Sequence, residues 1–216
     1  MYTPENFKVS DLPTLHADME RWNFATLITP QPEGELQVTH LPLLLKRDNG
    51  RLGTLAGHVA KANPHWKAFG ACRESLAIFH GPHAYVSPRW YQTEVAVPTW
   101  NYVAVHAYGT PSILQGAASM ERHLLQLIHH HEGMGPDSWR PDRVPRETFE
   151  SLMKAVVCFE MPIARIEGKA KLSQNRPPND VPGVIRGLQA TDRTDTRELA
   201  ELMLLRVLET QGQEGA

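Results

Sequence analysis

Two histidines stand beside other polar side chains at the ends of segments with a β-strand pattern. Thr39 precedes His40 in one segment, and His58 is followed by Lys61 and Asn63 in another. If the segments are neighbouring strands, a lysine, two imidazoles, a hydroxyl and free backbone amides could together cradle a phosphate. The alternative is that the histidines are hydrogen-bonded residues inside a barrel, because buried polar groups normally find partners.

A second polar run, residues 168–176, follows the last expected strand. It contains Lys169, Lys171, Ser173, Gln174 and Arg176. Such a run can bind a phosphate or the edge of a planar ring, although basic surface loops are also common. Aromatic side chains flank the polar groups and either stack on a flat ligand or belong to the core. They are Trp66, Tyr85, Trp90, Tyr91 and Trp100.

The other histidines give weaker signals. Residues 129–131 are three histidines on an expected helix, where neighbouring side chains point about 100° apart, so this pattern indicates a solvated face. His80 and His83 flank a Gly-Pro pair and could bind a metal, but no third ligand is evident. The chain has no motif of a serine nucleophile, a P-loop, a dinucleotide-binding loop or a zinc protease.

The composition is that of an ordinary globular protein. Of 216 residues, 41% are apolar and 21% charged, which is enough to form a core without disulfides or metal. The formal net charge of −2 argues against a free-standing nucleic-acid binder. Cys72 and Cys158 lack metal-site spacing and suit a reducing cytoplasm. We expect neither a membrane span nor a signal peptide.

The segment that must position these groups is residues 97–109. After a proline turn, side chains at even positions from 102 to 108 point to one face and those between them to the other. Both faces are largely apolar, as in a barrel, a sandwich or a dimer interface. We expect this segment to be the central strand and one wall of a ligand site, with Thr99, Trp100 and Asn101 at its mouth.

The rest of the chain predicts a helix, a run of strands, two helices and a further strand. The expected helices cover 10–22, 65–69, 120–132 and 145–157; the expected strands cover 24–29, 36–45, 52–59, 75–80, 83–87, 97–114 and 157–166. Turns are expected at Asn49-Gly50 and Gly81-Pro82, and Pro42 implies an edge, bulge or bend. This order favours an antiparallel barrel with peripheral helices over alternating βαβ units.

The C-terminal part differs in character. Residues 175–180 break regular structure, and two helices are expected after them, over 181–190 and from 195 onward. We therefore expect a main domain over 1–174 and a linker with a helical extension over 175–216. An amphipathic terminal helix usually docks on its own domain or on a dimer mate.

Five motifs, in order, resemble the PaiB-like FMN-binding negative transcriptional regulators. They are THLPL at 39–43, GHVAKANP at 57–64, GPHAYVSP at 81–88, VPTWNY at 97–102 and KLSQNR at 171–176. The resemblance covers roughly residues 1–188. It implies an α+β fold built on an antiparallel split β-barrel, related to pyridoxamine-phosphate oxidases, and a homodimer with FMN at its interface.

The same resemblance implies roles for individual residues. His58 and Lys61 would hold the FMN phosphate, and Thr39, His40 and Leu41 would line the isoalloxazine ring. Thr99, Trp100 and Asn101 would close the site, and Lys171, Ser173 and Gln174 would complete it.

Three functions remain open from the sequence. The resemblance implies a cytoplasmic repressor that acts on genes directly or indirectly, although no helix-turn-helix is visible. The second is a flavin-dependent oxidoreductase acting on a small molecule. The third is a haem-binding split barrel in which His80 or His83 ligates iron.

Overall fold

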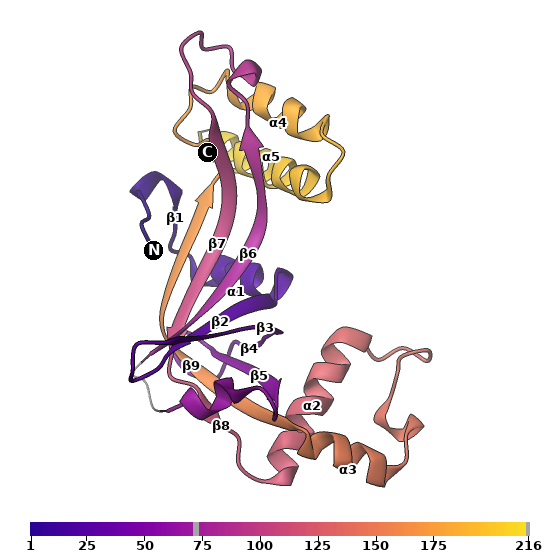
Figure 1. The fold of residues 1–216 in the computed structure, drawn as a ribbon. Helices are drawn as coiled ribbons and strands as arrows, with labels where there is room; N and C mark the ends of the chain where they lie inside the picture. The colour runs from indigo at the N-terminus through magenta and orange to yellow at the C-terminus, as the bar shows by residue number, and fades with distance from the viewer. Residues whose placement is uncertain (71–73, 215–216) are drawn as a thin grey trace. The chain divides into compact units, whose positions relative to one another are not determined.

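The computed structural model describes residues 1–70 and 74–214 (Figure 1). Cys72, which was expected to be a lone thiol outside any metal site, lies outside the described residues. The chain forms two compact units. Unit 1 comprises Met1–Leu15, His80–Val105 and Glu167–Ala216, and unit 2 comprises His16–Phe79 and His106–Ile166.

An antiparallel sheet runs through the fold. Its strands are β1 (Lys8–Val9), β2 (Phe24–Pro30), β3 (Leu36–Pro42), β4 (Leu44–Lys46), β5 (Thr54–Ala60), β6 (Ser75–Val86), β7 (Thr99–Gly109), β8 (Ser112–Ile113) and β9 (Val156–Lys171). Their order is β3-β2-β6-β7-β9-β5-β4, with β1 and β8 also paired to β9. Within the described part of the chain this order has two unpaired ends, β3 and β4, so strand pairing does not close a barrel there.

Strand β7 lies in the middle of this order. The prediction of a central strand within residues 97–109 is therefore confirmed, with β7 starting at Thr99. Its expected continuation to residue 114 is wrong, because β7 ends at Gly109 and Ser112–Ile113 form the separate strand β8, which pairs with β9. On one face of β7 the side chains of Asn101, Val103, Val105 and Ala107 are buried, whereas on the other face only Ala104 is buried. This pattern is typical of an antiparallel strand with one face on the core, and the central position follows from the two neighbours of β7, β6 and β9.

Unit 2 combines two hairpins with two helices. The β2–β3 and β4–β5 pairs are antiparallel, and Gly50 takes a φ of +88° in the second turn, as expected for an Asn-Gly turn. Helices α2 (Ala117–Glu132) and α3 (Arg146–Lys154) follow, and α3 buries Phe149 and Met153. The short helices η2 (Pro64–Ala68) and η4 (Pro141–Arg143) also belong to unit 2. Helix α1 (Leu12–Arg21) begins in unit 1 and ends in unit 2.

Unit 1 joins the remaining strand segments to helices α4 (Val181–Gln189) and α5 (Thr194–Glu214) and to the short helices η1 (Glu5–Phe7) and η3 (Pro88–Trp90). Leu188 of α4 and Leu199 of α5 are fully buried. Helix α4 approaches η3 closely, because a Cβ on Gly183 would lie 1.9 Å from the Trp90 carbonyl oxygen. Asp180 ties the preceding segment down by accepting hydrogen bonds from the amides of Gln92 (2.8 Å) and Thr93 (3.0 Å).

Four sequence-based boundaries need correction. The turn expected at Gly81-Pro82 is absent, and β6 continues through both residues. Strand β6 pairs with β2 only at Leu76–Ile78, so the missing N–H of Pro82 costs no hydrogen bond to β2. The segment expected as one strand over 36–45 bends after Pro42 into β3 and β4. Helix α3 ends at Lys154. Strand β9 then runs from Val156 to Lys171 and takes in part of the expected basic loop.

The expected division between residues 174 and 175 stays a prediction. That position falls within the Glu167–Ala216 segment of unit 1. Among the described residues, no helix is both long and apolar enough to cross a membrane.

Candidate functional site

A chain of hydrogen bonds in unit 2 connects β3 to the turn after β5. Asn63 Nδ2 donates to Thr39 Oγ1 (3.0 Å), and Thr39 Oγ1 lies 2.7 Å from His65 Nδ1. His65 Nε2 lies 2.8 Å from Thr29 Oγ1, which is 2.8 Å from Ser75 Oγ. Thr29, His65 and Ser75 are buried. The turn is thereby held in a fixed position against β3.

The imidazole of His65 is neutral in this arrangement. Burial lowers its pKa. A neutral ring needs one donor and one acceptor nitrogen. Since Thr39 already accepts from Asn63, the consistent assignment has the Thr39 hydroxyl donating to Nδ1 and Nε2–H donating to Thr29. His65, Thr29 and Ser75 were not predicted as site residues, because a lone buried histidine carries no distinguishing pattern in the sequence.

Lys61 lies exposed at the start of this turn. Its backbone N–H donates to the Ala155 carbonyl (2.8 Å), and its carbonyl accepts from Trp66 Nε1 (3.0 Å). Among the described residues, no carboxylate forms an ion pair with its ammonium group. A fixed backbone that carries an unpaired cation can accept a phosphate.

The two residues that follow Thr39 point to opposite faces of β3. Leu41 is buried, whereas His40 is exposed and its Nδ1 lies 3.0 Å from Thr26 Oγ1 on β2. The backbone of residues 39–41 is thus held by strand pairing, with only alternate side chains open to a ligand.

His58 has different surroundings from those of His40. Its ring meets His123 of α2 edge to face, with centroids 5.9 Å apart, and burial lowers the pKa of His58. It also lines an apolar cavity of about 250 Å³ under α2 and α3. His58 is therefore neutral near pH 7 and can offer a phosphate only a hydrogen bond.

The predicted residues of unit 1 form two contacts of their own. Lys171 Nζ donates to the hydroxyl of Thr99 and to the carbonyl of Trp100, the latter at 2.7 Å. Burial, followed by the nearby charges of Lys169 and Arg176, lowers the pKa of Lys171. An anion bound beside Lys171 would offset this repulsion.

Asn101 and Ser173 are both buried, and Asn101 Nδ2 donates to Ser173 Oγ at 2.8 Å. Ser173 has a φ of +66°, which is uncommon for a residue other than glycine. The Gln174 side chain turns back on its own segment, accepting from the Leu172 amide (2.6 Å) and donating to the Ala170 carbonyl (2.5 Å). These three residues therefore shape the chain after β9.

Across the described residues 1–70 and 74–214, the predicted residues therefore do not form one hydrogen-bonded site. They fall into three hydrogen-bonded groups. Thr39 and the Lys61 turn are connected in unit 2, while Thr99, Trp100 and Lys171, and likewise Asn101 and Ser173, are connected in unit 1. Residues 129–131 are exposed at the end of α2, as expected. No cluster of three or more metal-binding side chains occurs in the described part of the chain.

Two solved structures are similar to this chain in fold. The flavocytochrome Anf3 of Azotobacter vinelandii aligns with a TM-score of 0.59 and 16% identity, covering 76% of this chain and 69% of that one. The FAD- and haem-binding protein of Mycobacterium smegmatis aligns with a TM-score of 0.56 and 13% identity, covering 76% and 73%. At these identities the likeness is one of fold, and it confirms the expected split-barrel class.

The chain belongs to the family described as "Putative FMN-binding domain", which matches residues 1–165. It is 36% identical over 204 residues to the "Protease synthase and sporulation protein PAI 2" of Bacillus subtilis (strain 168), covering 94% of this chain and 96% of that protein. The PaiB-like resemblance and the FMN cofactor are thereby confirmed. The residues of unit 2 fit this cofactor, since an unpaired lysine suits a phosphate and a fixed β3 backbone suits a ring edge.

Proposed function

We propose that the protein is a cytoplasmic FMN-binding homodimer of the PaiB type that acts as a negative regulator of gene expression. The observation that carries the flavin site is the hydrogen bond between Asn63 and Thr39, which fixes the Lys61 turn against β3. Bound FMN would supply electron transfer, and the chain would supply binding and orientation.

In this proposal Lys61 grips the phosphate and His58 adds a hydrogen bond. Residues 39–41 line the ring. The unit 1 residues Thr99, Trp100, Asn101, Lys171, Ser173 and Gln174 remain proposed contacts, with Lys171 as the charged member of that group. Lys61 is supported as a phosphate contact because its ammonium group is exposed. Lys171 is supported because its pKa is lowered, and a bound anion would stabilise its charged form.

The homodimer is supported by one face of the β2–β3 hairpin. Phe24, Leu36 and Val38 are 67%, 61% and 52% exposed, and they lie on the same face because Phe24 pairs with Pro42 and Ile28 with Val38. The polar Thr26–His40 pair separates Phe24 from Val38 and Leu36 on this face. Exposed apolar side chains on one face of a sheet commonly mark an interaction surface. A second copy of the chain would remove them from water.

The regulatory role is proposed by analogy with the Bacillus subtilis relative, whose name refers to protease synthesis and sporulation. The net charge of −2 favours regulation through a bound metabolite or a partner over tight DNA binding by this chain alone. A DNA shift that weakens with salt would instead support direct binding, and bleaching of the flavin by NAD(P)H would support the oxidoreductase. A Soret band would support haem.

The decisive experiment is an FMN titration of the full chain, followed by absorbance, with the molar mass measured by light scattering. We expect flavin to co-elute with a dimer, and Lys61→Ala to weaken FMN binding by about tenfold through loss of a charge-assisted contact. Lys8→Ala is the matched control, because it removes the same charge from an exposed position in unit 1. Failure of the wild-type chain to retain FMN in excess cofactor would refute the proposal.

A further inference from the structure

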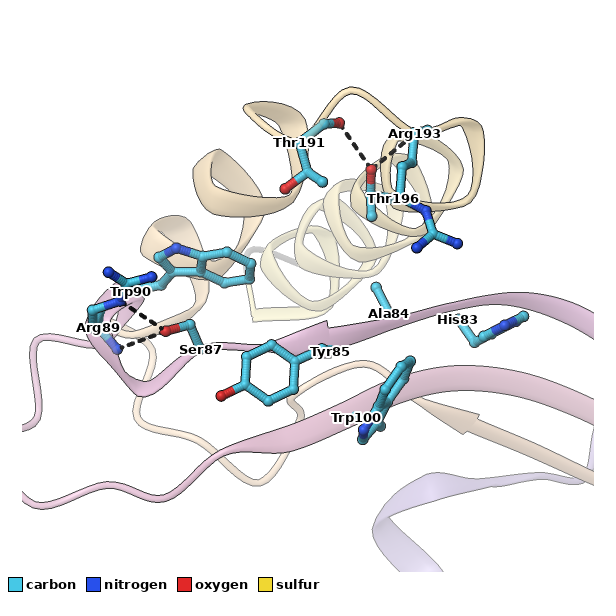
Figure 2. A pocket seen from close by; sticks show the side chains of 10 residues that line it. All are labelled: His83, Ala84, Tyr85, Ser87, Arg89, Trp90, Trp100, Thr191, Arg193 and Thr196. Atoms are coloured by element: carbon cyan, nitrogen blue, oxygen red, sulfur yellow. Dashed lines mark hydrogen bonds between the residues drawn. The ribbon is translucent and has the colours of Figure 1, made fainter.

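A pocket of about 280 Å³ lies within unit 1, between β6, β7 and the connection from α4 to α5 (Figure 2). Its ten lining residues are His83, Ala84, Tyr85, Ser87, Arg89, Trp90, Trp100, Thr191, Arg193 and Thr196. Of these, only Trp100 belongs to the residues proposed for FMN. The pocket is therefore a feature that the flavin proposal leaves unexplained.

Aromatic side chains form one wall of the pocket. Tyr85 and Trp100 are 46% and 54% exposed and meet edge to face, with ring centroids 6.2 Å apart. The His83 ring lies 6.4 Å from Trp100 at an angle of 31°. Large aromatic groups left open beside a cavity are suited to stacking on a planar ligand.

The charged side chains of the pocket are all basic. Arg89 and Arg193 both line it, and none of the ten residues is acidic. Arg193 reaches from the α4–α5 connection toward β6 (Figure 2). Its partner Asp195 is 3.8 Å away and both side chains are exposed, so this ion pair is weak. Guanidinium groups with free N–H donors favour a carboxylate or another planar oxyanion.

The walls of the pocket are fixed before any ligand binds. Thr196 Oγ1 lies 2.8 Å from the Arg193 carbonyl and 3.0 Å from that of Thr191, which holds the α4–α5 connection. Trp90 packs directly on Gly187 of α4, where an added Cβ would lie 2.3 Å from the indole ring. A pre-formed site loses less entropy on binding than a mobile one.

We propose that this pocket binds a small planar aromatic carboxylate. Its volume is just below the roughly 300–1,000 Å³ of pockets for drug-sized ligands, so one ring or two fused rings would fit. The ring stacks on Trp100 and Tyr85, and the carboxylate meets Arg193. Trp100 is the one residue that this site shares with the proposed FMN contacts, and binding of the carboxylate does not depend on FMN.

The test uses 2-naphthoate as the probe and its neutral isostere 2-naphthamide as the comparison, with binding to the full chain followed by calorimetry. We expect saturable 1:1 binding of naphthoate and binding of the amide that is weaker by about tenfold or more. Arg193→Gln should weaken naphthoate binding by a similar factor, and Arg193→Lys by less. Arg197→Gln is the matched control: it removes the same charge from an exposed arginine nearby, which pairs with Asp192 and does not line the pocket.

The titration is repeated on chain saturated with FMN. Equal naphthoate affinity with and without FMN supports a separate site. If the chain binds naphthoate but fails to retain FMN, the carboxylate proposal is supported and the flavin proposal is refuted. Four results would each overturn the carboxylate proposal. They are absence of saturable naphthoate binding, equal affinity for the amide, equal effects of Arg193→Gln and Arg197→Gln, and displacement of naphthoate by FMN. Thermal melts of the variants confirm that they fold.

Discussion

His58 of β5 and His123 of α2 meet edge to face in unit 2, with ring centroids 5.9 Å apart. Three of their four ring nitrogens are buried and have no hydrogen-bond partner among the residues that the structure describes: His58 Nδ1 and both nitrogens of His123. Burial, then the proximity of His58 and of Lys46, lowers the pKa of His123 to about 4, while Glu160 acts in the opposite direction. This pair therefore makes the fold sensitive to acid.

The contribution of His123 to stability should fall as the pH decreases from about 6.5 to 4. His123 is neutral in the folded state over this range, whereas in the unfolded chain it protonates near its ordinary value of 6.5. Protonation thus favours the unfolded state, and the free energy of unfolding should fall by up to about 3 kcal/mol. Urea titrations at pH 7, 6, 5 and 4 measure this loss.

The contribution of His123 is isolated by comparing variants. His123→Phe should make the protein less destabilised by acid than the wild type, whereas His129→Phe, at an exposed position of the same helix, should retain the wild-type slope. The comparison is needed because burial raises the pKa of Asp18 to about 6, which has the opposite effect on stability. Equal slopes for His123→Phe and the wild type would exclude His123 as the acid-sensitive group.

Replacing His65 should loosen both the fold and the flavin site. His65→Phe removes the bonds to Thr39 and Thr29 in a buried position, at a cost of about 1–3 kcal/mol in unfolding free energy. FMN affinity should fall as well, because Thr39 and Asn63 lose a fixed partner. His16→Phe, which removes the bond from a buried histidine to the Leu52 carbonyl, should lower stability and leave FMN affinity unchanged.

Gly183→Ala should destabilise the protein, although alanine is the better helix former by about 1 kcal/mol. The added Cβ would lie 1.9 Å from the Trp90 carbonyl oxygen, so α4 must move away from η3. Overpacking of this kind costs about 1–3 kcal/mol, which a thermal or urea melt detects. Gly135→Ala is the control, since its nearest atom is the Ser138 hydroxyl oxygen at 3.6 Å; a loss of the same size there would contradict the explanation.

A charge on the open face of β3 should break the proposed homodimer. Val38→Glu places a carboxylate among the exposed apolar side chains of the β2–β3 hairpin, so light scattering should report a monomer. Val95→Glu introduces the same charge at a residue that is 90% exposed in unit 1, and it should remain dimeric. A dimeric Val38→Glu protein would show that another surface joins the copies.

Cys158 should resist alkylation in the folded protein. It is 1% exposed, and burial raises the pKa of its thiol to about 11, so almost no reactive thiolate forms near pH 8. Mass spectrometry after treatment with iodoacetamide should find this residue unmodified in buffer and modified in guanidinium chloride. Rapid labelling of Cys158 without denaturant would show that β9 opens readily.

Local patterns were enough to predict several elements. The alternation from residue 99 to 109 predicted β7, because a strand places successive side chains on opposite faces. Asn49-Gly50 predicted the β4–β5 hairpin, because Gly50 must adopt a positive φ. The same motifs, compared with a known family, predicted the flavin cofactor.

The sequence by itself therefore determined the strand and helix pattern, the fold class and the family. Only the tertiary structure decided that β6 continues through Gly81-Pro82, that His58 faces His123, and that Thr39 is joined to His65. These features depend on strand pairing and on contacts between segments far apart in the chain. Whether a histidine is a solvated cation or a buried neutral ring is set by such neighbours, and residue type and spacing do not encode them.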